Sequence, residues 1–240
     1  MLGTWINVGA VLVGSLVGLL AGRKVPEAIT RSAAVGVGLV TLVLGTQLAI
    51  GTENALVLLL ALLIGGGLGT WLRIEDRLAR LGEMSERWFP ARVRGTIPQG
   101  FVAATLLFCI GPMAVLGSIR DGVYGDWRIL GLKSVMDGIS SIGLVAGLGP
   151  GVFLSAATVL VYQGAITLGA HWLMTPSAVA GASEVLAPSP ALTELNAVGG
   201  AVLIALSFKL LGIRDLKVGN LLPALALAPL FAYLAARLMA

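Results

Sequence analysis

Residues 130–173 read LGLKSVMDGISSIGLVAGLGPGVFLSAATVLVYQGAITLGAHWL. Two apolar runs, 130–148 and 152–173, are separated only by Gly149-Pro150-Gly151. Each run is close to the ~20 residues that a helix needs to cross a hydrocarbon core of about 30 Å. Both runs are rich in Leu, Ala and Gly and lack the alternation of β-strands, so the stretch predicts transmembrane helices rather than barrel strands.

The rest of the chain repeats this pattern of long apolar runs with short charged connections. Hydrophobic residues make up 57% of the 240 residues and charged residues 12%, about half the share of an ordinary soluble domain. We therefore predict an all-α fold, a polytopic transmembrane helical bundle with about eight crossings, forming a single integral membrane domain over 1–240. The predicted crossings are 4–21, 33–50, 55–72, 100–119, 130–148, 152–173, 193–211 and 219–237.

Basic residues are concentrated in alternate connections. The connections 22–32, 73–99 and 210–218 are rich in Arg and Lys, whereas 51–54 and 174–192 each carry one acidic residue and no basic one. Basic connections stay in the cytoplasm, so we expect a multi-pass protein of the cytoplasmic (inner) membrane with both termini outside. No basic region precedes the first run, so we expect no cleaved signal. The formal charge of +4 forms no large basic patch, and nucleic acid is not an expected partner.

Two connections are long enough to have a structure of their own. Apolar residues recur at helical spacing in 73–94, which predicts an amphipathic helix on the cytoplasmic surface, within a helix and loop over 73–98. The connection 174–192 contains three prolines and predicts an external loop. Small residues four apart at Gly14–Gly18–Gly22, Gly65–Gly69 and Gly143–Gly147 predict close helix packing and are compatible with a homo-oligomer.

Lys133 and Asp137 are the charged residues that draw attention within the quoted stretch. They are four residues apart, so they share one face of a helix and are able to pair. A charged group inside a bilayer costs at least about 2.5–3.5 kcal/mol, and such groups are usually functional or paired. Lys133 is also near enough to the predicted boundary to extend to the surface, with Asp137 only neutralising it. Both interpretations stay open.

Helix-breaking residues and polar side chains surround this pair. Gly111-Pro112, Gly138 and Gly149-Pro150-Gly151 indicate broken or re-entrant helices around 111–112 and 138–151, and irregular backbone at membrane depth needs protein or a water-filled cavity beside it. Packing and ordinary hydrogen bonds between helices are the alternative. The predicted substrate or ion pathway consists of Lys133, Asp137, Ser134, Ser140, Ser155 and Gln163. Secondary candidates are Asn7, Cys109, Met113, Asn196 and Asn220.

Catalytic and metal-binding patterns are weak in this sequence. Cys109 and Met113 would share a helical face and offer soft ligands, but two such ligands without a third do not make a metal site. The single cysteine excludes an internal disulfide, and the single histidine excludes a multi-histidine metal site. Hydrolase and metalloprotease motifs are missing. We expect no catalytic residues, no metal, no cofactor and no enzymatic activity.

Residues along the whole chain resemble those of one bacterial family, with the most specific block at 108–163. They are Phe108-Cys109, Met113-Ala114, Gly117-Ser118-Ile119, Asp121-Gly122, Lys133-Ser134, Asp137-Gly138, Gly151-Val152, Ser155, Gln163, Gly199-Gly200 and Asn220-Leu221-Leu222-Pro223-Ala224. This set is similar to the YqgA/YdfK-type membrane proteins, a family with a domain of unknown function. The resemblance implies a membrane location and this architecture, and it supplies no substrate. Pro112 departs from the small residue expected at its position.

Two functions fit these observations. The first is a small secondary transporter or channel for an ion or small metabolite, with Lys133 and Asp137 as the coupling pair. The second is a non-transporting scaffold, sensor or partner subunit that acts through the helix at 73–94. The expected partners are the lipid bilayer and, for the first function, the transported solute.

Overall fold

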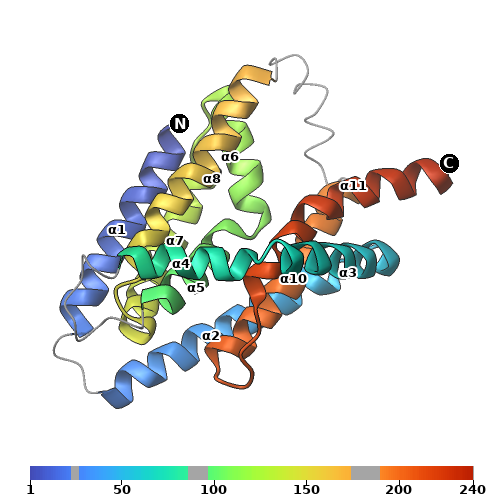
Figure 1. Cartoon of the computed structure of the whole chain (residues 1–240). Coiled ribbons are helices and arrows are strands. Elements are labelled where there is room, and N and C mark those ends of the chain that lie inside the picture. Colours follow the sequence, from blue (N-terminus) through green and yellow to red (C-terminus); the bar gives the residue numbers. More distant parts are fainter. Residues whose placement is uncertain (23–26, 86–96, 174–189, 240) are drawn as a thin grey trace. The chain divides into compact units, whose positions relative to one another are not determined.

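The computed structural model describes residues 1–22, 27–85, 97–173 and 190–239, and all regular secondary structure in these ranges is helical (Figure 1). This confirms the all-α prediction. The helices are α1 (Leu2–Gly22), α2 (Glu27–Ile50), α3 (Ala55–Trp71), α4 (Ile74–Ser85), α5 (Ile97–Cys109), α6 (Pro112–Tyr124), α7 (Arg128–Leu148), α8 (Val152–Leu173), α10 (Pro190–Leu210), the short 3-10 helix η4 (Val218–Leu221) and α11 (Leu222–Met239).

Several of these helices are long and apolar enough to cross a membrane. Five described helices meet that criterion alone, and the number rises to seven if each of two bent pairs is one crossing. The pairs are α3 with α4, bent by 50°, and α5 with α6, bent by 62°. The predicted run 33–50 corresponds to a shorter apolar helix, Val35–Ile50. The polytopic helical bundle is thus confirmed, while the count of eight crossings stays a prediction.

The chain divides into two compact units. Unit 1 contains Met1–Val37 and Ala79–Ala182, and unit 2 contains Gly38–Leu78 and Ser183–Ala240. Each unit is assembled from segments distant in the sequence. This division does not test whether residues 1–240 form a single membrane domain, which stays a prediction.

In unit 1, the glycine ridge of α1 is the surface against which α7 packs. A Cβ on Gly14 would overlap the carbonyl group of Gly138, and one on Gly18 would lie 2.7 Å from the carbonyl oxygen of Ile142. The contacts advance in the same direction along both helices, so α1 and α7 run parallel. The predicted role of Gly14 and Gly18 in close helix packing is confirmed, and the contact lies within the chain.

The predicted break at 111–112 is present between α5 and α6. Gly111 has a φ of 130°, a region that favours glycine, and Pro112 begins the next helix. The two helices follow α8 in one direction. A Cβ on Gly100 would lie 3.4 Å from the amide nitrogen of Val152 near the start of α8, and one on Gly122 would meet Ala170 near its end. A re-entrant hairpin would return toward the start of α8, so the contacts favour one broken crossing.

The predicted irregularity around 138–151 is confined to its last three residues. α7 continues through Gly138 to Leu148, and the chain turns at Gly149, whose φ is 84°. The expectation of a break at Gly138 was wrong, because this glycine lies where α1 approaches most closely and its small size serves packing. α7 and α8 are each a straight candidate span.

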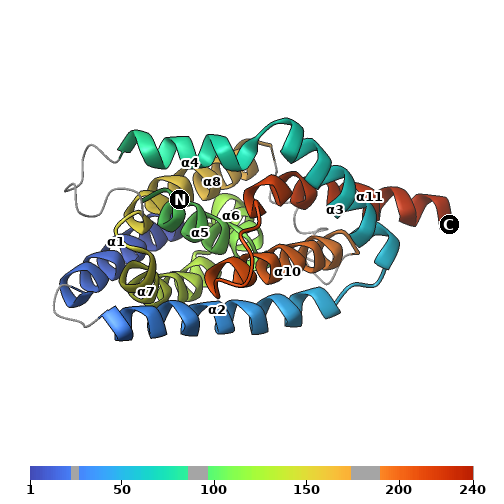
Figure 2. The same ribbon diagram turned by 60° about the horizontal axis from the view of Figure 1, so that its bottom comes forward.

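Unit 2 is built on two close glycine contacts. A Cβ on Gly65 would overlap Ala224 of α11, and a Cβ on Gly69 would overlap the backbone of Asn220 in η4. In the same unit, the second half of α2 runs alongside α10 in the opposite direction, with Gly45 against Gly200 (Figure 2).

The predicted connections are described only in part. The amphipathic helix is α4, which ends at Ser85; residues 86–96 lie outside the described ranges, and 97–98 belong to α5. Of the predicted external loop 174–192, residues 174–189 also lie outside them, and 190–192 form the start of α10.

Candidate polar site in unit 1

In unit 1, helices α1 and α7 bury polar side chains and expose apolar ones. On α1 the buried face includes Thr4, Asn7 and Ser15, whereas its exposed residues include Leu12 and Val13. On α7 the buried polar residues are Lys133, Ser134, Asp137 and Ser141, and the exposed apolar residues are Leu132, Val135, Met136 and Ile139. A water-soluble helix shows the reverse pattern. This arrangement is typical of a membrane bundle whose interior carries the polar chemistry.

Lys133 and Asp137 lie at the centre of this interior, and each is only 6% exposed. The ammonium group of Lys133 donates to Oδ2 of Asp137 in a short contact. Asn7 of α1 donates from Nδ2 to the same oxygen over 2.9 Å. The ammonium also lies 6.0 Å from the centre of the Phe108 ring of α5. The predicted pair therefore forms, and it joins three helices.

Several buried polar atoms of this interior have no hydrogen-bond partner among the described residues. They are Oδ1 of Asn7, Oγ of Ser15 and both side-chain polar atoms of Gln163. Gln163 is fully buried on α8. A buried amide left unpaired costs about 1–3 kcal/mol, so this glutamine is a stronger candidate for a functional residue than a hydroxyl that already has a partner.

Two of the three predicted serines are satisfied within their own helices. Ser134 donates to the carbonyl of Leu130 over 2.6 Å, and Ser155 donates to that of Val152 over 2.6 Å. Both are buried, whereas Ser140 is half-buried. A solute would have to compete with these short intrahelical hydrogen bonds, which makes the serines weaker ligands than Asn7 or Gln163.

The polar interior meets an apolar cluster at one end. Thr4 of α1 and Thr167 of α8 have their hydroxyl oxygens 3.4 Å apart, and the amides of Asn7 and Gln163 follow one turn further along each helix. Beyond these residues lies a cluster of buried apolar side chains, although Ser15, Ser141 and Ser155 are also buried in that half of the helices. This cluster contains Val8, Val11, Ala104, Phe108, Leu144, Val145, Val152, Ala156 and Val159. The charged and amide side chains of this interior thus lie on one side of the apolar cluster.

The secondary candidates are scattered. Cys109 is buried at the end of α5 and Met113 is exposed on α6, so the break at Gly111 separates them. The prediction that they share one helical face was wrong, because that spacing requires a continuous helix. Asn196 and Asn220 belong to unit 2, where Oδ1 of Asn196 is buried without a hydrogen-bond partner among the described residues. In the described part of the chain, no group of three His, Cys, Asp or Glu side chains is arranged to hold a metal.

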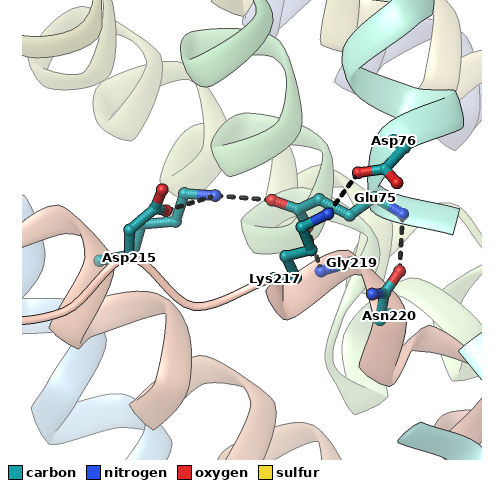
Figure 3. Close-up of polar contacts among 7 residues, drawn as sticks. Glu75, Asp76, Asp215, Lys217, Gly219 and Asn220 are labelled. Atoms are coloured by element: carbon teal, nitrogen blue, oxygen red, sulfur yellow. Dashed lines mark hydrogen bonds and ion pairs between the residues drawn. The ribbon is translucent and has the colours of Figure 1, made fainter. Parts of the chain in front are cut away.

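Unit 2 contains a second buried carboxylate, Glu75 in the first turn of α4 (Figure 3). Lys209 at the end of α10 donates to Oε1 of Glu75 over 2.6 Å, and the Gly219 amide donates to Oε2. The Glu75 amide in turn donates to Oδ1 of Asn220 over 2.9 Å. Lys209 also pairs with Asp215 at 3.3 Å. This network follows the bend after α3, where Arg73 has a left-handed φ of 51°.

The sequence analysis missed Glu194 of α10. This buried carboxylate accepts hydrogen bonds from the hydroxyl of Thr52 and the amides of Glu53 and Asn54, each over 2.8 Å. Asn54 then caps α3 with its own side chain. The available signal was one acidic residue inside the apolar run 193–211, which is costly unless it is paired.

These observations define a helical membrane protein whose charged and polar groups lie inside the bundle. Comparison with known sequences gives its family: the chain belongs to the family described as protein of unknown function (DUF554), which it matches over residues 2–233. It is 27% identical over 233 residues to the uncharacterized membrane protein YdfK of Bacillus subtilis (strain 168), covering 95% of this chain and 94% of YdfK. It is 30% identical over 237 residues to the uncharacterized protein YqgA of Escherichia coli (strain K12), again covering 95% and 94%. No solved structure matches the chain.

Proposed function

We propose that this protein is a small secondary transporter or channel for an ion or small metabolite, without enzymatic activity. We place it in the cytoplasmic membrane with both termini outside, following the distribution of basic connections. The observation that carries the proposal is the Lys133–Asp137 pair, buried in a polar interior that also contains the unpaired amide of Gln163.

A purely structural role explains this pair poorly. A buried ion pair adds little net stability, because losing the hydration of both charges offsets most of their attraction. Apolar residues of similar size often stabilise the same position equally well or better. A polar interior with unmet hydrogen bonds is in contrast what a passing solute requires. A transport role accounts for both the pair and the unpaired amide.

The geometry supports a switch centred on Asp137. Both Lys133 and Asn7 donate to Oδ2, so protonation of this carboxyl would weaken two contacts between helices at once. The ring of Phe108 remains beside the released ammonium and would stabilise it by a cation–π interaction. The other titratable group close to the pair is the Cys109 thiol of α5. A change of partners for Lys133 would shift the balance between two conformations.

Any conducting conformation must also open the apolar cluster. Leu144 of α7 and Val152 of α8 belong to that cluster, and neither offers a polar atom to a solute. In this proposal the described conformation is closed on the cluster side, and alternate access requires the packing of α1, α5, α7 and α8 to change there.

The proposal is tested by flux measurements on the purified full-length chain in lipid vesicles. Ions and small metabolites are screened with and without a pH gradient, and Asp137→Asn is compared with the unaltered protein. We expect this variant to lose at least tenfold in flux and to lose its dependence on pH. The control is Asp126→Asn, which makes the same change in a partly exposed residue paired with Arg120.

Unchanged transport and pH dependence in Asp137→Asn would refute the coupling role. If no solute moves in the unaltered protein, the scaffold or sensor function through α4 becomes the better explanation. Gly14, Gly18, Gly65 and Gly69 give no support to a homo-oligomer, because their close contacts lie within the chain. The oligomeric state therefore remains a prediction.

A further inference from the structure

The unmet hydrogen-bonding atoms of unit 1 are three oxygens, of Asn7, Ser15 and Gln163, and two nitrogens, of Arg120 and Gln163. Oδ1 of Asn7 and Oε1 of Gln163 are buried without a partner in the described part of the chain. On Asp137, both donors reach Oδ2. Two amide oxygens and a carboxylate therefore have free acceptor capacity. These three acceptors outnumber the one unpaired donor beside them, Nε2 of Gln163, so the site suits a ligand that is positively charged or rich in hydrogen-bond donors.

Helix register brings these groups to one level. Thr4 and Thr167 are in contact, and α1 and α8 run in opposite directions from that point. Asn7 lies three residues after Thr4, and Gln163 lies four residues before Thr167, so each is about one turn, or roughly 5.4 Å, further along. Asn7 in turn bonds Asp137 of α7. The site thus takes one side chain from each of three helices.

The charge of the site selects the class of ligand. Oxygen donors suit hard cations, and divalent ions are usually held by more carboxylates than the one available here. The ammonium of Lys133 already occupies the carboxylate as an internal cation. An entering cation would replace it there, while Phe108 offers Lys133 a neighbouring position.

We propose that Asp137, Asn7 and Gln163 form a binding site for a small monovalent cation, which competes with the ammonium of Lys133 for the carboxylate. The inference rests on the proposed function, because it names the class of ion that the same site would carry or use for coupling.

The test measures binding separately from flux. The purified full-length chain in detergent is titrated with NaCl, KCl, NH4Cl or MgCl2 against choline chloride, at constant pH and ionic strength. Heat of binding and thermal unfolding are recorded. We expect saturable binding and a rise in unfolding temperature with at least one small monovalent cation. The inference would be overturned if no cation gave a larger heat of binding or a higher unfolding temperature than choline. A preference for Mg²⁺ would overturn it as well.

The decisive variant is Gln163→Leu, because its two expected effects have opposite signs. It removes a buried amide that has no partner, so we expect the cation-free protein to unfold at a higher temperature than the unaltered protein. It also removes one ligand, so we expect cation affinity to fall at least tenfold. A merely structural glutamine would lower stability when replaced and leave cation affinity unchanged, and that result would overturn the inference.

Two further variants distinguish the loss of a ligand from a general loss of folding. Gln163→Glu keeps the ligand oxygen and adds a second carboxylate, so we expect preference to shift at least tenfold toward Mg²⁺; an unchanged preference counts against the site. Ser118→Ala is the control, because this buried hydroxyl of α6 bonds the carbonyl of Ala114 in its own helix. Loss of cation binding in Ser118→Ala equal to that in Gln163→Leu would also refute the assignment.

Comparison with the vesicle assay separates the two proposals. Specific cation binding without flux of any solute would retain this inference and refute the proposed transport function. If a solute is transported, but the protein binds no small cation and the flux does not depend on one, the transport function would be retained and this inference refuted.

Discussion

Glu194 gives the most direct test of the structure of unit 2. Its carboxylate holds the segment that precedes α3, accepting from the hydroxyl of Thr52 and from the amides of Glu53 and Asn54. Glu194→Gln keeps the size of the side chain and removes its charge. A hydrogen bond to a charged group contributes about 1.5–3 kcal/mol, against about 0.5–1.5 kcal/mol for a neutral one.

The two amide hydrogen bonds to Glu194 determine how much stability Glu194→Gln is expected to lose. Each loses about 1 kcal/mol when its acceptor becomes neutral, whereas the hydroxyl of Thr52 can rotate to accept from the new amide. We therefore expect Glu194→Gln to destabilise the protein by about 2 kcal/mol, which for a chain of this size lowers the unfolding temperature by roughly 4–8 °C.

Thermal unfolding of the purified protein in detergent is the assay, at one pH and one detergent concentration. Glu53→Gln is the matched control, since it makes the same chemical change on an exposed side chain in the same segment. We expect this control to stay within about 0.5 kcal/mol of the unaltered protein, as surface substitutions usually do. Equal unfolding temperatures for Glu194→Gln and Glu53→Gln would refute the assigned role of the buried carboxylate.

Two paired comparisons test other contacts of unit 2 in the same unfolding assay. Gly69→Ala should destabilise by about 1–3 kcal/mol because its Cβ would overlap the backbone of η4. Gly67→Ala should stabilise by about 0.5–1 kcal/mol, since no neighbouring atom lies within 4 Å of its added Cβ. If both variants changed the free energy of unfolding in the same direction, the close packing at Gly69 would be contradicted. Lys209→Met should cost about 2–3 kcal/mol by leaving Glu75 buried without its cation. Lys217→Met, in an exposed pair, should cost under about 1 kcal/mol, and an equal loss would count against the Glu75 network.

The sequence was sufficient for the features that follow from local composition. Apolar runs near twenty residues long determine helices, and the Lys133–Asp137 spacing places both charges on one helical face. The break at Gly111 also follows from local chemistry, because glycine and proline each disfavour a continuous helix. Gly138 shows the limit of this reasoning: the same residue type marks a break in one place and a close helix contact in another, and only the neighbouring helix decides.

Partners that are distant in the chain could not be predicted in this way. Asn7 meets Asp137 across 130 residues, and Glu75 meets Lys209 across 134. Single polar residues within apolar runs indicate that some partner exists, yet they do not say which one. For Gln163 the sequence predicted a pathway residue, but it gave no reason to rank it above Ser155; hydrogen-bond satisfaction provides that reason.

The two units differ in the buried charged networks that they contain. In unit 2, Glu194 near the start of α10 and Lys209 near its end bond the segments just before and just after α3. These contacts fix the register of α3 against α10, and satisfied networks of this kind make a structure rigid. In unit 1, Asn7 and Gln163 keep buried atoms without a partner among the described residues, and in unit 2 Oδ1 of Asn196 does so as well. Such exceptions require a specific cause, and a ligand that enters beside Asp137 supplies one for Asn7 and Gln163. The Glu194 and Lys209 networks thus form a rigid framework around α3 and α10, whereas the buried Lys133–Asp137 pair and the unpaired Gln163 lie in unit 1.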